Sequence, residues 1–266
     1  MKLSDLLQLE PHGPDTWVGS GPTYPWGGLY GGQIVAQGLM AASQSVPKEF
    51  AVHSLHAYFI RRGDASAPIR FEVDRIRDGR SFFTRRVVAR QSTGAILNMS
   101  ASYQLHEEGP ALQTEEKPEA PTPESLEPDS WSPVFDRRKV ASAIKAGRGQ
   151  AWFRILHEVG EEPVRHACAL AYASDDVPVN ALIAIHPDRV ATSQEFFATS
   201  LDHAIWFHKP LRAEDWHLYD FRVHSLGRNR GLTLGHIFSS TGVHIATVAQ
   251  ELLVRRKRES ERLSGG

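Results

Sequence analysis

Five polar side chains stand in otherwise apolar stretches of this sequence and could do chemistry. Asp175 and Asp176 interrupt an apolar, helix-like run, Gln250 lies in an aliphatic strand, and Thr199 and Ser200 place hydroxyls at the start of another strand. A buried carboxylate is unfavourable unless it is paired or hydrogen-bonded, so a conspicuous one raises a functional question. Each group also has a structural interpretation. The aspartates could form a helix cap or an exposed turn, the amide could bridge two strands, and single hydroxyls are usually structural.

The common signatures of hydrolases and cofactor enzymes are missing. No Gly-x-Ser-x-Gly motif is present, which argues against a nucleophile elbow. Ser200, Asp202 and His203 are close in sequence, but strand alternation predicts that His203 faces away from the other two, so a serine triad would have poor geometry. His203 and His208 should likewise face opposite ways, which argues against a metal site. The glycine-rich stretch 27–32 does not match the dinucleotide-binding spacing. We expect no metal and no cofactor.

Composition limits the classes of protein and the cellular locations that are expected. The chain has 266 residues, 41% of them apolar, and a formal net charge of −1, so no strong field recruits nucleic acid or a membrane. Cys168 is the single cysteine and lies in an apolar run, which favours a buried structural thiol and excludes an intrachain disulfide. No apolar stretch approaches about 20 residues, and the N-terminus lacks a secretory pattern. We therefore expect no membrane insertion and a cytoplasmic protein.

The second half of the chain repeats the first. A run that begins His56-Ala57-Tyr58-Phe59 has a counterpart that begins His203-Ala204-Ile205-Trp206-Phe207, and each run predicts four strands. Between them, residues 107–133 are rich in Pro, Glu, Ser and Thr, which is typical of a surface linker. The predicted domains are an N-terminal unit, a linker and a C-terminal unit, at residues 1–106, 107–133 and 134–266.

Each unit is predicted to pair helices with an antiparallel meander. A glycine-rich loop feeds a helix with apolar residues at helical spacing over 34–42. Short loops between successive strands require antiparallel pairing, so the predicted fold is α+β with the sheet wrapped around the helix. We expect strands at residues 52–62, 69–77, 81–91, 95–106, 195–208, 216–225, 231–239 and 243–255, a helix at 138–146, and a long apolar stretch at 164–185.

Several long motifs, in the same order, resemble the bacterial acyl-CoA thioesterase II family. They are residues 30–39 (YGGQIVAQGL), 53–64 (HSLHAYFIRRGD), 77–82 (RDGRSF), 172–175 (YASD), 201–210 (LDHAIWFHKP) and 248–251 (VAQE). The resemblance covers nearly the whole chain except the linker. It implies a double hotdog, with two tandem units, each an antiparallel sheet wrapped around a helix, forming one continuous sheet.

The resemblance also implies a site and a substrate. In the family an Asp, a hydroxyl residue and a Gln hold an attacking water, and by motif position these are Asp175, Ser200 and Gln250. The usual hydroxyl residue is threonine, so Thr199 and Ser200 both remain candidates. The implied substrate is an acyl-CoA, and the expected assembly is a homo-oligomer. Residues expected to contact the substrate are Gly32, His56, Arg61, Arg80 and Thr199.

Two other functions remain open on the same scaffold. One is a protein that binds acyl-CoA or another acyl thioester without efficient turnover. The other is a hydratase or dehydratase, which would need an acid–base pair such as Asp with His, and His53, His56 and His203 keep that possibility open.

Overall fold

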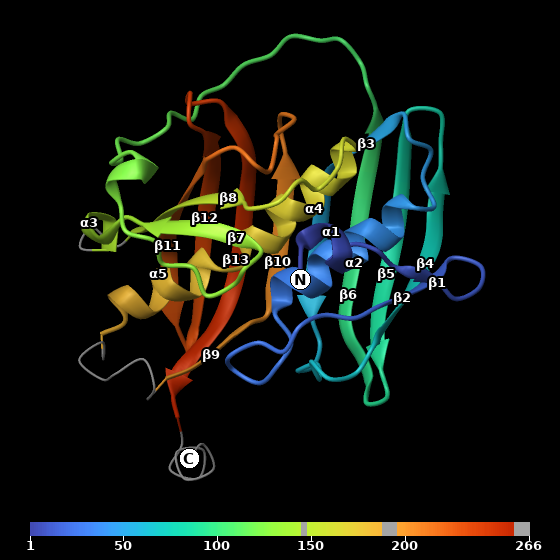
Figure 1. Ribbon diagram of the computed structural model, residues 1–266, viewed down its shortest axis with the longest axis horizontal. Coiled ribbons are helices and arrows are strands. Elements are labelled where there is room, and N and C mark those ends of the chain that lie inside the picture. The colour runs from blue at the N-terminus through green and yellow to red at the C-terminus, as the bar shows by residue number, and fades with distance from the viewer. Residues whose placement is uncertain (145–147, 188–195, 258–266) are drawn as a thin grey trace.

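A computed structural model describes residues 1–144, 148–187 and 196–257 (Figure 1). The first half contains α1 (Leu3–Leu6), β1 (Glu10–Pro11), β2 (Thr16–Gly19), α2 (Gly31–Ser43), β3 (Phe50–Phe59), β4 (Ile69–Asp78), β5 (Phe82–Gln91) and β6 (Gly94–Leu105). A short 3-10 helix, η1 (Pro123–Ser125), interrupts the connection to the second half. The second half contains β7 (Phe135–Lys139), α3 (Ala141–Ile144), β8 (Arg148–Ile155), α4 (Pro163–Ser174), α5 (Val177–Ile185), β9 (Phe196–Ser200), β10 (Asp202–Phe207), β11 (His217–Gly227), β12 (Arg230–Ser239) and β13 (His244–Arg256).

All the strands join one antiparallel sheet. Its order is β1-β2-β4-β5-β6-β3-β10-β13-β12-β11-β8-β7, and β9 pairs with β13 beside this path. The two halves mirror one another across the β3–β10 junction, where Leu55 pairs with Ile205 and Ala57 with His203. Backbone hydrogen bonds therefore continue from one half to the other, and neither half leaves an open sheet edge at the centre.

The helices α2 and α4 lie side by side on one face of this sheet (Figure 1). α2 is buried from Gly32 to Ala42, as its run of small and aliphatic residues predicts, because it is enclosed by the sheet and by α4. Gly32 permits the closest approach, since a Cβ there would lie 2.2 Å from the carbonyl oxygen of Tyr172 on α4. The N-terminus of α2 is thus pressed against the C-terminal turn of α4.

The predicted strands of both meanders are present, but the start of the second unit differs from the prediction. A helix was expected at residues 138–146. Instead Arg138 and Lys139 end β7, α3 is only four residues long, and residues 145–147 lie outside the described part. The strand β8 was not predicted, although Ala151, Phe153 and Ile155 alternate toward the core. β8 pairs with β7 on one side and with β11 on the other, and this pairing overrides a weak local helical preference.

The strand expected at residues 195–208 is broken. Its first residue lies outside the described part, and the rest forms β9 and β10 with Leu201 between them. Ser200 pairs with Leu252 and Ala204 with Ala249, so the five residues 200–204 lie opposite the four residues 249–252 of β13. The extra residue is a bulge, and it changes which face the following side chains occupy.

The repeat is one residue out of register when His203 is matched to His56. His56 is exposed on the outer face of the sheet, whereas His203 is fully buried on the inner face. Counting back from the strand ends, Phe59 and Phe207, makes Leu55 the counterpart of His203. A shift of one residue exchanges the two faces of a strand. Matching His203 to His56 in the sequence therefore assigns His203 to the wrong face of the sheet.

The connection between the halves arches over the ends of the strands (Figure 1). Gln113 donates to the carbonyl of Gly242 at 2.9 Å, and the indole of Trp152 donates to the carbonyl of Pro121 at 2.9 Å. These contacts hold the connection against the second half. The exact bounds of the two units and the linker stay a prediction.

One helical stretch among the described residues is long and apolar enough to cross a membrane by length and composition. It spans Pro163–Ile185, with a mean hydropathy of 1.2, and corrects the expectation that no stretch approaches that length. The stretch is divided here, because α4 ends at Ser174 and α5 begins at Val177. About two thirds of its most apolar window is buried within the fold, and buried core helices pass the same test, so it is weak evidence for membrane crossing.

Candidate active site

The candidate site forms around Asp175, the residue that caps the C-terminus of α4. Its side chain is only 6% exposed and meets residues from three other parts of the chain. The hydroxyl of Ser200 donates to Asp175 Oδ1 at 3.0 Å, and Gln250 Nε2 donates to the same oxygen at 2.7 Å. Gln250 Nε2 also donates to Ser200 Oγ at 2.6 Å. The structure therefore brings together the three residues singled out by the resemblance, which are far apart in sequence.

The N-terminus of α2 supplies the third partner of Asp175. The backbone N–H of Gly32 donates to Asp175 Oδ2 at 3.0 Å. The first N–H groups of a helix have no partner within the helix, and the helix dipole favours negative charge there. In this structure the Gly32 N–H binds the aspartate, and the expected contact between Gly32 and the substrate stays a prediction.

Burial dominates the electrostatics of Asp175. The pKa of its carboxyl is raised to about 6, mainly by desolvation and in smaller part by the neighbouring charge of Asp176. The hydrogen bonds from Gln250, Ser200 and Gly32 act in the opposite direction and lower the pKa. A carboxyl with a pKa near 6 is mostly ionised at neutral pH, yet is a stronger base than an ordinary aspartate. These are the properties of a general base.

Asp176 points the other way and is held by a buried cation. Arg137 Nη1 contacts Asp176 Oδ1 at 2.7 Å and Oδ2 at 2.6 Å, and both side chains are nearly excluded from solvent. The indole of Trp131 also donates to Asp176. Adjacent aspartates thus have different roles, one bound to a cation and one bound only by neutral donors.

Sequence reasoning did not identify Arg137 or the aromatic residues that surround this region. Tyr30, Tyr172 and Trp131 pack edge to face, and the hydroxyl of Tyr30 donates to the carbonyl of Tyr172 at 2.8 Å. Arg137 is 39 residues from Asp176, so no local pattern links them. The one available signal was Asp176 itself, because a second acidic residue in an apolar stretch requires a partner.

Ser200, not Thr199, supplies the hydroxyl in this structure. Thr199 is exposed on β9, and neighbouring residues of a strand face opposite ways. His203 is also next to the group, because its Nδ1 lies 2.8 Å from Gln250 Oε1. The prediction that His203 faces away from Ser200 is therefore wrong, since the bulge at Leu201 turns both inward. A Ser200–Asp202–His203 triad is still not formed, because Asp202 accepts from the backbone N–H of Glu251.

The other predicted substrate contacts lie outside this group. His56 packs edge to face on Trp206 on the outer face of the sheet, and Arg61 donates to the carbonyl of Ala95 at 2.8 Å. Arg80 is exposed in the turn between β4 and β5. Contact between the substrate and these residues or Thr199 stays a prediction.

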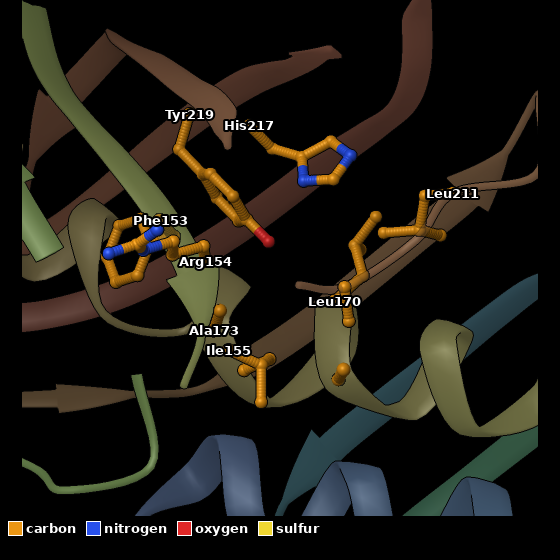
Figure 2. A pocket seen from close by; sticks show the side chains of 10 residues that line it. Phe153, Arg154, Ile155, Leu170, Ala173, Leu211, His217 and Tyr219 are labelled. Carbon is orange, nitrogen blue, oxygen red and sulfur yellow. The ribbon is translucent and has the colours of Figure 1, made fainter. Parts of the chain in front are cut away.

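A small pocket lies between α4 and the sheet (Figure 2). Leu170 and Ala173 of α4 line one side, and Phe153, His217 and Tyr219 line the other. Its volume of about 10 Å³ is near the minimum needed to hold one water molecule. It begins at Ala173, two residues from Asp175 along the chain, and it would have to widen to admit an acyl chain.

Comparison with known proteins identifies the family. The model of the acyl-CoA thioesterase N-terminal domain matches residues 20–104, and that of the C-terminal domain matches residues 107–254. The chain belongs to the acyl-CoA thioesterase family. It is 33% identical to acyl-coenzyme A thioesterase 8 of Rattus norvegicus over 96% of this chain and 89% of that protein. It is also 33% identical to acyl-CoA thioesterase 2 of Haemophilus influenzae over 95% of this chain and 96% of that one.

Solved structures of other proteins share the architecture. An acyl-CoA thioesterase II from Mycobacterium marinum superposes with a TM-score of 0.85 at 37% identity, covering 97% of this chain and 98% of that one. A protein described as having a hot dog fold, from Alicyclobacillus acidocaldarius, superposes with a TM-score of 0.80 over 96% of this chain and 98% of that one, at 18% identity, which supports the fold alone. The predicted α+β double hotdog with one continuous sheet is therefore confirmed. The protein is a thioester hydrolase of this family.

Proposed function

We propose that this thioesterase hydrolyses fatty acyl-CoA to free fatty acid and CoA, using a water molecule activated by Asp175 and oriented with the help of Ser200 and Gln250. The observation that supports it best is the buried cluster around Asp175, whose carboxylate is bound by three donors and has a raised pKa of about 6. The names of the relatives make acyl-CoA the natural substrate class.

The hydrogen-bonding capacity of the cluster defines where a water would bind. An ionised carboxylate offers about four lone-pair positions, and Asp175 uses two on Oδ1 and one on Oδ2. Ser200 Oγ donates once and accepts once, so one lone pair remains. A water that donates to Asp175 Oδ2 and Ser200 Oγ would keep a lone pair free for attack. Both protons of the Gln250 amide are used, so Gln250 orients Asp175 and Ser200.

Hydrolysis then takes two steps. Asp175 accepts a proton as the water oxygen bonds to the thioester carbonyl carbon, which gives a tetrahedral oxyanion. Collapse of that intermediate breaks the carbon–sulfur bond, and the CoA sulfur leaves with a proton returned from Asp175. Holding the water in place lowers the entropic cost of attack. The Gly32 N–H is bound to Asp175, so the oxyanion would need another donor.

Release of CoA from a panel of acyl-CoA chain lengths tests this function. We expect stoichiometric free CoA and fatty acid, with a chain-length optimum. A parallel incubation with an enoyl-CoA, analysed by mass spectrometry for water added across the double bond, is expected to yield no 3-hydroxyacyl product. Saturable acyl-CoA binding without CoA release, or hydration of the enoyl-CoA, would contradict the proposal and favour the binding protein or the hydratase.

A further inference from the structure

His203 lies directly behind the candidate site and has no solvent exposure. Its Nδ1 is 2.8 Å from Gln250 Oε1, and its Nε2 is 2.8 Å from Ser174 Oγ. Ser174 ends α4 immediately before Asp175. A continuous chain of hydrogen bonds therefore runs from Ser174 through His203 and Gln250 to Asp175.

The equivalent positions in the first half are apolar. Leu55 is the counterpart of His203 by strand position, and it pairs with Ala101 of β6, just as His203 stands beside Gln250 of β13. Leu55 and Ala101 are both buried. The sheet thus does not need polar groups at this place in order to fold. Burying an imidazole and an amide is unfavourable without mutual hydrogen bonds, so the pair has a purpose specific to the second half.

The network assigns the proton positions of this histidine. Gln250 Oε1 can only accept, so His203 Nδ1 carries the hydrogen and Nε2 accepts from the hydroxyl of Ser174. The carbonyl of Ala171, 3.2 Å from Ser174 Oγ, is the other acceptor within its reach. If the Ser174 hydroxyl donated to the carbonyl of Ala171, His203 Nε2 would have to carry the ring hydrogen in order to donate to Ser174. The lone pair of His203 Nδ1 would then face a lone pair of Gln250 Oε1, which is unfavourable.

We propose that His203, in its Nδ1–H tautomer, is a positioning residue that holds the Gln250 amide with its nitrogen toward Asp175 and Ser200. This inference rests on the proposed function of those three residues. Without the Nδ1 donor, Gln250 could rotate and present its oxygen to the Asp175 carboxylate, an acceptor facing an acceptor. The Ser200 hydroxyl would then lose its donor and the water its fixed orientation.

His203 does not serve as the acid or base in this account. Gln250 lies between it and Asp175, and both of its nitrogens are engaged. Burial lowers the pKa of His203 to about 4, opposed by the hydrogen bond with Gln250, so the ring is neutral where Asp175 is ionised. This separates a positioning role from the Asp–His pair that a hydratase would use.

Two substitutions of similar size separate the two ring nitrogens. In His203→Asn the amide nitrogen can take the place of Nδ1 and still donate to Gln250, whereas in His203→Gln it takes the place of Nε2 and reaches Ser174 instead. We expect His203→Asn to keep kcat within about threefold, and His203→Gln to lower kcat by about 10- to 100-fold with little change in KM. Equal kcat values for two folded variants would overturn the proposal, as would a loss confined to KM.

A spectroscopic measurement on the unmodified protein covers the case in which the variants do not fold. Long-range proton–nitrogen correlation spectra distinguish the two neutral tautomers of histidine, and we expect His203 as Nδ1–H from pH 5 to 8. An Nε2–H tautomer or an imidazolium at neutral pH would overturn the inference. If Asp175→Asn were fully active, the proposed function would fail while this tautomer could still be observed, so the two failures are distinguishable.

Discussion

Asp175→Asn is expected to lower kcat for acyl-CoA hydrolysis by about 10²- to 10⁴-fold, the usual contribution of a general base. The amide is nearly isosteric and can still accept from Ser200 and Gln250 at the Oδ1 position. It cannot take the proton from water, and its NH2 group would face the N–H of Gly32. The substitution also removes a charge whose burial is unfavourable, so the fold should persist. Free CoA release under saturating substrate measures the effect.

Asp202→Asn is the matched control for this substitution. Asp202 is the first residue of β10. Its Oδ1 accepts the backbone N–H of Glu251 at 2.7 Å, an interaction that asparagine retains. We expect its kcat to stay within about twofold of the wild type, since asparagine keeps this hydrogen bond and the general base is unchanged. Wild-type turnover in a folded Asp175→Asn variant would remove Asp175 from the mechanism.

The pH dependence of kcat supplies a second readout of the same residue. The base is the ionised form of Asp175, and burial raises its pKa to about 6, so hydrolysis should fall as pH drops through about 6 and reach a plateau above it. An unperturbed aspartate would keep its activity down to about pH 4. The residual activity of Asp175→Asn should lack this acid limb.

Arg137→Met is expected to lower the free energy of unfolding by about 3 to 5 kcal/mol, because it leaves Asp176 buried without its cation. Arg137 also donates to the carbonyl of Asp129, so the end of the linker loses an anchor. Urea unfolding measures the effect, and the midpoint should fall while the slope is unchanged. The uncompensated Asp176 charge should also raise the pKa of Asp175 further.

Arg86→Met is the control for the ion pair. Arg86 also lies on a strand and pairs with Asp74 through Nε at 2.8 Å, but both side chains are about half exposed. Exposed pairs contribute about 1 kcal/mol or less. If Arg137→Met were as stable as Arg86→Met, the buried pair of Arg137 and Asp176 would not contribute the expected free energy of unfolding.

Local patterns predicted the elements more successfully than their relative positions. The helix at residues 34–42 and the strands of both meanders follow from apolar periodicity and short turns, and the structure contains them. The bulge at Leu201 depends on pairing with β13 and has no signature in the strand itself. That single inserted residue determines which face of the sheet His203 occupies. Strand alternation alone therefore could not predict that His203 is buried next to Gln250.

The candidate site was likewise predicted only in part from local sequence patterns. Asp175 and Gln250 stood out because each is polar in an apolar stretch, but that pattern left a structural explanation open, and the family resemblance was needed to group them with Ser200. The partner of Asp176 lies on β7, in a segment that was predicted to contain a helix. Long-range ion pairs such as this one depend on tertiary packing, so a single sequence does not reveal them.

A single-turnover reaction in H2(18)O, with enzyme in excess over acyl-CoA, tests direct attack by water most sharply. If Asp175 acts as a general base, the fatty acid from the first turnover carries one oxygen-18 atom, and mass spectra of the quenched protein show neither an acyl adduct nor label at Asp175. An unlabelled acid, or oxygen-18 or an acyl group on the peptide that contains Asp175, would show that the carboxylate itself attacks the thioester and would contradict this mechanism.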